Sequence, residues 1–159
     1  MAITPETRDY RTFEVRALDT GEEDKQYRVE GYAAVFDEET VLYEYDGIEY
    51  KEVIDRSAFS GAEMRDVVMN YNHGGKPVAR TKNGTLQLTV DTRGLRISAD
   101  LSGTEEGRRL YEEIRGGYLD QMSFAFTVNK QEYDRAKHLR RITGFKRVFD
   151  VAAVDIPAY

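Results

Sequence analysis

Residues 117–128, GYLDQMSFAFTV, predict a turn that begins at a glycine, followed by a β-strand. Side chains alternate across a β-strand, so this stretch has two faces. One face is large and apolar and requires a core: Met122, Phe124, Phe126 and Val128. The other is small and polar: Gln121, Ser123, Ala125 and Thr127. The alternation predicts a rigid strand that could hold Ser123 at the floor of a groove, although serine is also common on the solvated face of such strands.

The bulk composition predicts one soluble domain over residues 1–159, in which residues 1–10 are loosely held. Hydrophobic residues make up 40% and charged residues 33%, enough for a core beneath a well-solvated surface. The net charge of -6 argues against a nucleic-acid partner. No apolar run is long enough to span a membrane, and the N-terminus shows no signal peptide, so no membrane partner is expected.

The residue types also limit the chemistry. Cysteine is absent, which removes disulfides, thiolate nucleophiles and cysteine-based zinc sites and fits a reducing compartment. The only histidines, His73 and His138, are far apart in sequence, so no metal site is expected. The run Gly74-Gly75-Lys76-Pro77 lacks the spacing of a phosphate-binding loop. We therefore expect no cofactor and no metal.

Alternating and short apolar segments dominate the rest of the chain. The expected strands are residues 11–18, 27–36, 48–54, 67–71, 78–81, 85–90, 95–101, about 121–132, and 145–156. Asn83-Gly84 predicts a hairpin turn, and residues 37–47 read as an acidic, tyrosine-rich loop.

Two segments read as helical. Residues 104–115 begin with acidic residues, end at Arg115 and stop at two glycines, as a helix should. Residues 55–59 resemble a cap followed by a short helix. The whole pattern predicts a mainly β (α+β) fold, an antiparallel β-barrel with one or two flanking helices.

Two side chains could cooperate with Ser123. His73 follows an apolar strand and precedes two glycines, which suits a cleft, although a histidine that caps a strand end is the simpler explanation. Asp150 lies in an apolar strand, on the face of Val148, Ala152, Val154 and Ile156 by simple alternation. A buried carboxylate needs a partner, which could be an imidazolium, an arginine or a backbone NH. Ser123, His73 and Asp150 could thus form a nucleophile, a base and an orienting acid. His138 lies in a basic turn and needs no chemical role.

At these residues the sequence resembles the prohead (capsid maturation) proteases of tailed bacteriophages. The matching pieces lie in order along residues 27–159: Gly31 to Phe36, Glu52 to Phe59, Asn72-His73, Gly84 to Leu86, Arg93-Gly94-Leu95, Gly107 with Leu110, Met122 to Phe126, and Asp150 to Tyr159. The pattern departs from the family at Gly74, Gln121 and Ala125, and Asp150 stands where the family often has glutamate.

The resemblance implies a serine endopeptidase with a herpesvirus assemblin-like barrel. Ser123 would be the nucleophile, His73 the general base and Asp150 the third member, with Arg80 as a candidate supporting residue. The implied substrates are the scaffolding segment of the major capsid protein and the protease itself. The implied location is the immature prohead in the cytoplasm of the bacterial host, and the implied assembly is a dimer. Because relatives usually carry a further tail, we also expect that the chain is trimmed or self-processed.

Two other classes of protein remain open. One is a non-catalytic capsid assembly or scaffold-docking factor with the same barrel, which would bind the capsid protein without cleaving it. The other is a lipocalin-like barrel, which would enclose an apolar cavity and keep the serine and the histidine apart.

Overall fold

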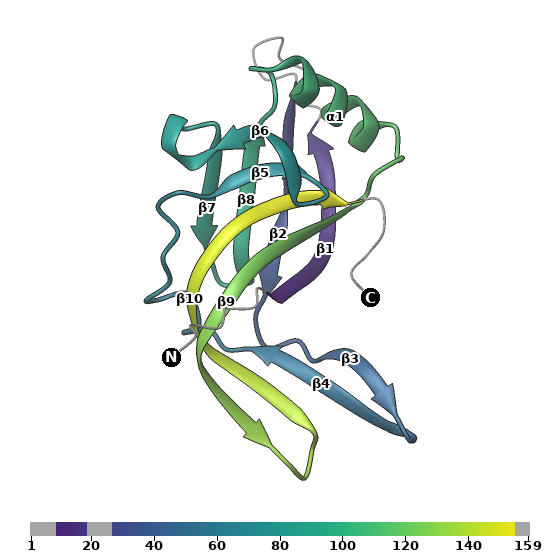
Figure 1. The fold of residues 1–159 in the computed structure, drawn as a ribbon, viewed down its shortest axis with the longest axis vertical. Coiled ribbons are helices and arrows are strands. Elements are labelled where there is room, and N and C mark those ends of the chain that lie inside the picture. The colour runs from purple at the N-terminus through teal and green to yellow at the C-terminus, as the bar shows by residue number, and fades with distance from the viewer. Residues whose placement is uncertain (1–8, 19–26, 155–159) are drawn as a thin grey trace, which may run out of the picture.

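Ten strands and one α-helix make up the described part of the chain, residues 9–18 and 27–154, in a computed structural model (Figure 1). The strands are β1 (Asp9–Leu18), β2 (Arg28–Val35), β3 (Thr40–Tyr45), β4 (Ile48–Ile54), β5 (Val68–Tyr71), β6 (Gly74–Arg80), β7 (Leu86–Val90), β8 (Gly94–Asp100), β9 (Gln121–Asp134) and β10 (Leu139–Val154). The helix α1 (Glu105–Arg115) precedes β9, and a 3-10 turn, η2 (Thr81–Asn83), precedes β7.

Strand β10 organises the sheet. It pairs along its length with β9 in an antiparallel hairpin. Its other edge carries two parallel strands in succession, β4 beside Leu139–Ile142 and β5 beside Asp150–Ala153. The main order is β3-β4-β10-β9-β1-β2-β8-β7, and β6 is attached through β5. Segments far apart in sequence therefore meet on β10.

The expected barrel closure is not found among the described strands. The hydrogen-bonded order ends at β3 on one side and β7 on the other, so the curved sheet stays open. The fold is mainly β with one α-helix in the described ranges, which confirms the predicted fold class. In Figure 1, β3, β4 and the far halves of β9 and β10 project away from α1 and the other strands as an arm. Register shifts between Ile142 and Arg147 occur where the β9–β10 hairpin enters this arm, and such bulges bend strands.

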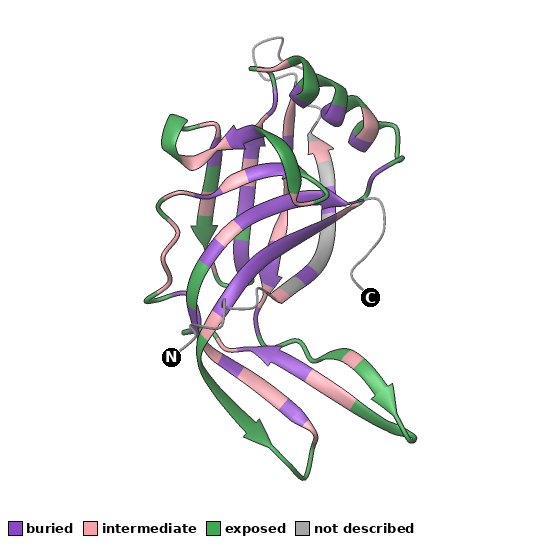
Figure 2. Ribbon diagram, viewed as in Figure 1, coloured by how far each residue is buried: buried purple, intermediate pink, exposed green. Residues whose placement is uncertain are grey.

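The apolar face of β9 lies in the core, as predicted. Met122, Phe124 and Phe126 are fully buried, and Val128 packs against the same cluster. The rings of Phe124 and Phe126 stack at 4.6 Å between centroids, and both meet Phe145 edge-on. The opposite face is buried too: Ser123 is 2% exposed, and Ala125 and Thr127 are also buried (Figure 2). The alternative explanation of Ser123, a serine on a solvated strand face, therefore does not hold at this end of β9.

Helix α1 begins and ends where the sequence predicts. The hydroxyl of Thr104 accepts a hydrogen bond from the NH of Gly107 at 2.9 Å and caps the first turn. Gly117, with φ of 80°, follows the last turn. The buried face of the helix includes Leu110, Tyr111 and Ile114, which join the core.

Three local predictions are wrong. Residues 40–45, expected in a loop, form strand β3. Residues 55–59 form turns rather than a helix, because the carboxylate of Asp55 accepts from both the NH and the hydroxyl of Ser57. Asn83-Gly84 ends the 3-10 turn η2 instead of joining two paired strands, since β6 pairs with β5 and β7 with β8.

Candidate active site

Ser123 lies near the start of β9, directly opposite Ala152 on β10. Its Oγ is buried and has no hydrogen-bond partner among the described residues. Buried hydroxyls are normally paired, so an orphaned one calls for an explanation such as a chemical role. Its strand neighbours include the small Ala125, two positions along β9, and Ala152 across from it on β10, while Thr12 of β1 pairs with it on the other side. Ser123 is nevertheless only 2% exposed, so the surrounding residues cover the hydroxyl.

A bulge in β10 brings Asp150 to this face. Val148 pairs with Phe126 and Asp150 pairs with Ala125, so Phe149 is an extra residue between the two pairs. The side-chain alternation therefore shifts by one: Val148 packs in the core, whereas Asp150 shares the face of Ser123. The sequence-based assignment of Asp150 to the face of Val148 is corrected in this way. Asp150 is only 6% exposed.

His73 reaches Asp150 from a tight hairpin. Strand β5 ends at Tyr71 and β6 begins opposite it at Gly74, so Asn72 and His73 form the two-residue loop. Both have positive φ, 50° and 58°, the backbone pattern of a type I′ turn. Asparagine and histidine enter this region of the φ/ψ map more readily than most residues, and a two-residue turn of this type requires it at both positions.

The imidazole of His73 is oriented by the carboxylate of Asp150. Nδ1 of His73 makes a short contact with Oδ1 of Asp150. Because a carboxylate can only accept, Nδ1 is the nitrogen that carries the proton in this contact, and the lone pair of the neutral ring lies on Nε2. The histidine thus has the tautomer that a general base needs.

The three predicted site residues gather on adjacent strands. Ser123 is the diagonal neighbour of Asp150 across β9 and β10, and such neighbours lie roughly 7–8 Å apart. The ring of His73 contacts Asp150, so it lies over β10 within the same neighbourhood. Ser123, His73 and Asp150 come from β9, the β5–β6 turn and β10, and Ser123 and Asp150 lie on one face of the sheet.

The sequence analysis missed a polar residue on this face. Asn70 on β5 pairs with Ala152, which in turn pairs with Ser123, so the three residues form a row across the sheet. Asn70 is 6% exposed and its Oδ1 is buried without a hydrogen-bond partner in the described ranges. Its position inside the apolar run of residues 67–71 is the signal that could have drawn attention to it.

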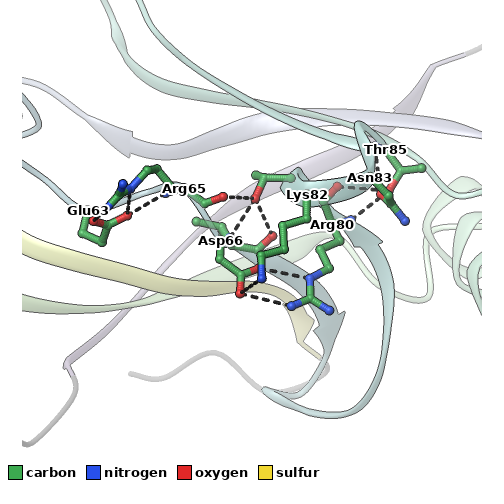
Figure 3. A network of polar contacts seen from close by, with 9 residues as sticks. Glu63, Arg65, Asp66, Arg80, Lys82, Asn83 and Thr85 are labelled. Atoms are coloured by element: carbon green, nitrogen blue, oxygen red, sulfur yellow. Dashed lines mark hydrogen bonds and ion pairs between the residues drawn. The ribbon is translucent and has the colours of Figure 1, made fainter.

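Arg80, the candidate supporting residue, has a different setting (Figure 3). Its guanidinium pairs with the carboxylate of Asp66 at 3.0 and 3.1 Å and lowers the pKa of Asp66 by hydrogen bonding. Lys82 lies 3.5 Å from the same carboxylate. Beside them, Arg65 pairs with Glu63 at 2.8 Å, and its hydrogen bonds lower the pKa of Glu63 to about 2. These contacts hold residues 63–66 against the end of β6, so Arg80 stabilises the segment that precedes β5.

Other features give no competing site within the described ranges. His138 lies in the arm against the ring of Tyr50, at 5.1 Å between centroids. No three acidic or histidine side chains of residues 9–18 and 27–154 cluster as metal ligands. In the same part of the chain, no helix is long and apolar enough to cross a membrane.

A carboxylate-oriented histidine and a serine on adjacent elements are residue types that serine hydrolases combine for acyl transfer, but no hydrogen bond joins Oγ of Ser123 to the ring of His73 in this structure. The comparison with protein families agrees, since residues 11–159 match the model of the caudovirus prohead serine proteases. The chain belongs to that family. No curated protein and no solved structure matches it significantly.

Proposed function

We propose that this protein is a serine endopeptidase that cleaves the scaffolding segment of the major capsid protein, and its own chain, inside the immature prohead in the bacterial host. Membership of the prohead protease family supports this reaction class. The observation that carries the proposal is the contact between Nδ1 of His73 and Asp150 on the face of Ser123.

The residues divide the acyl-transfer steps among them. Nε2 of His73 takes the proton of Ser123 while Oγ attacks the peptide carbonyl carbon. The imidazolium then gives that proton to the leaving amine, and an acyl-enzyme remains. Water attacks the ester in the same way and restores Ser123. Asp150 holds the tautomer of His73 and stabilises its charged form throughout.

The burial of Ser123 adds a requirement. A peptide carbonyl reaches an Oγ that is out of solvent contact only after this face opens. We therefore expect the enzyme to be slow in dilute solution and to become active where it is concentrated with its substrate.

The proposal is tested by co-expression with the major capsid protein of the same phage and measurement of the intact mass of that protein. Wild type should remove the scaffolding segment. Ser123→Ala and Asp150→Asn should reduce cleavage by about 10³-fold or more, since triad members act as a unit. Ser60→Ala is the matched control, because the Ser60 hydroxyl is exposed and bonds only its local turn.

The alternative function is a non-catalytic scaffold-docking factor. The buried Ser123 is the observation in its favour. Co-purification of uncut capsid protein with wild type and Ser123→Ala alike would establish this alternative and rule out the protease.

We also propose the fold type and the assembly state of the protein. An assemblin-like fold and a dimer follow from the family resemblance. The mass of the particle by light scattering, measured over a range of concentrations, tests the dimer.

A further inference from the structure

A groove lies between β6 and α1, beside the turn that carries His73. Its volume is about 610 Å³, within the usual range for ligand-binding pockets. Gly74 and Gly75, which follow His73 directly, form part of its wall. In Figure 1 the β5–β6 hairpin lies next to α1 and to the ends of β9 and β10 at which Ser123 and Asp150 are found. The groove therefore adjoins the candidate active site on its histidine side.

The β6 wall offers backbone groups to a partner. Between the pairs Tyr71–Gly74 and Met69–Ala79, β5 has one residue and β6 has four, residues 75–78. These four residues are outside the paired register, and β6 pairs with no described strand other than β5. An edge strand is a template for an added strand; Pro77 has no NH, so the NH groups of residues 75, 76 and 78 and the CO groups of this stretch are those that a partner would bond, and the two glycines allow close approach.

The side chains define the kind of peptide that fits. Val78 and Leu110 are buried and supply an apolar surface, to which Tyr71 adds its ring. Glu106 and Glu113 lie seven residues apart on α1, so both fall on the helix face that lines the groove. Neither makes an ion pair with any residue in the described ranges. An acidic helix wall above an apolar floor favours a segment that combines basic and apolar side chains.

One cation lies on the β6 wall of the groove, opposite α1. Lys76 lines the groove from β6 and also has no ion-pair partner in the described part of the chain. Arg109, the other cation of the groove, lies 3.8 Å from the carboxylate of Glu105, one helical turn away. The four charged side chains of the lining balance, but on the α1 wall two carboxylates outnumber Arg109, whose charge is shared with Glu105.

We propose that this groove binds the substrate chain on the His73 side of the scissile bond. The peptide adds as an extended strand to the edge of β6, places an apolar side chain against Val78 and Leu110, and sets a lysine or arginine beside Glu106 and Glu113. The inference rests on the proposed protease function and names the substrate segment that this function would select.

The test compares cleavage of a mixture of unstructured decapeptides, varied at every position, by wild type and by the double variant Glu106→Lys/Glu113→Lys. Mass spectrometry of the products gives the preference at each position. Wild type should prefer a basic residue at one position near the cut. The double variant should lose that preference at least tenfold, through KM rather than kcat. Glu112→Lys reverses a charge on the same helix, outside the groove and away from the Glu105–Arg109 pair, and should keep the wild-type preference.

A second measurement separates this inference from the protease function itself. The Ser123→Ala protein is titrated with a decapeptide that contains leucine and arginine, and the backbone amide signals of Gly75 and Lys76 are followed by NMR. Shifts that vanish when Glu106→Lys/Glu113→Lys is added support the groove even if no peptide is cut. A wild-type enzyme that reacts with a fluorophosphonate at Ser123, yet has the same peptide preference as the double variant, overturns it. So does an absence of amide shifts at millimolar peptide.

Discussion

Replacing Gly94 with alanine should destabilise the fold where β2 pairs with β8. A Cβ at Gly94 would lie 1.9 Å from the carbonyl oxygen of Ala34 and 2.9 Å from the Cα of Val35. Ordinary contacts of a Cβ begin at 3.4 Å. The neighbouring atoms belong to the backbone, so no side-chain rotation relieves the collision, and β2 and β8 must separate where Val35 pairs with Gly94.

The cost follows from what this separation disrupts. The hydrogen bond from the NH of Phe36 to the CO of Arg93, at 2.8 Å, lies next to the collision, and such a bond contributes about 1 kcal/mol. Leu95 and Ala34 are both fully buried, and loosened packing there costs about 2–3 kcal/mol more. The sum is about 3–4 kcal/mol. For a chain of this length the unfolding entropy is roughly 0.33 kcal/mol/K, so the Tm should fall by about 9–12 °C.

The measurement is calorimetry of Gly94→Ala beside Gly103→Ala. A Cβ at Gly103 meets nothing within 4 Å, and its φ is not positive, so this control should change the Tm by about 2 °C or less. A fall of under 4 °C for Gly94→Ala would refute the reasoning, because the two strands would then have accommodated a methyl group without losing their pairing.

Two further predictions concern ion pairs. Glu52 is 3% exposed and accepts hydrogen bonds from the guanidinium of Arg11 at 2.5 and 2.7 Å. Glu52→Gln should therefore lower the free energy of unfolding, measured by urea titration, by about 3 kcal/mol. Glu49→Gln, at an exposed position, is the control, and equal losses in the two variants would contradict a stabilising role of the buried pair. The pKa of Glu63 is lowered from 4.5 to about 2 by hydrogen bonds from Arg65, so its stabilising contribution is full above pH 4.5 and disappears as the pH falls toward 2. The urea midpoint of wild type should fall over that range by more than the midpoint of Arg65→Gln, and parallel curves would argue against the linkage.

The sequence predicted most elements whose local signals agree with their surroundings. The apolar side of β9 and the capped helix α1 are confirmed because residue periodicity and end signals are local properties. Strand β3 was missed because its residues are mostly exposed and lie between acidic segments, and its strand form comes from pairing with β4. Asn83-Gly84 carries a hairpin signal, but β6 pairs with a strand that precedes it, which turn chemistry does not encode.

The site residues were predicted from the sequence, whereas their arrangement was not. The buried setting of Asp150 and the glycines after His73 marked both as candidates, and the contact between them is a finding of the structure. The face of Asp150 could not be derived by counting, since one extra residue in β10 reverses the alternation. Burial of Ser123 is a tertiary property that the small polar face of β9 did not reveal.

The bulge at Phe149 has a consequence for how such chains can diverge. Successive residues of a strand point to opposite faces, so the number of residues between Val148 and Asp150 decides which face Asp150 lies on. Deletion of Phe149 would restore simple alternation, so that either the carboxylate of Asp150 faces the aromatic core or Val148 and its neighbours face away from it. In relatives that carry a carboxylate at the position of Asp150, this interval should therefore keep its length.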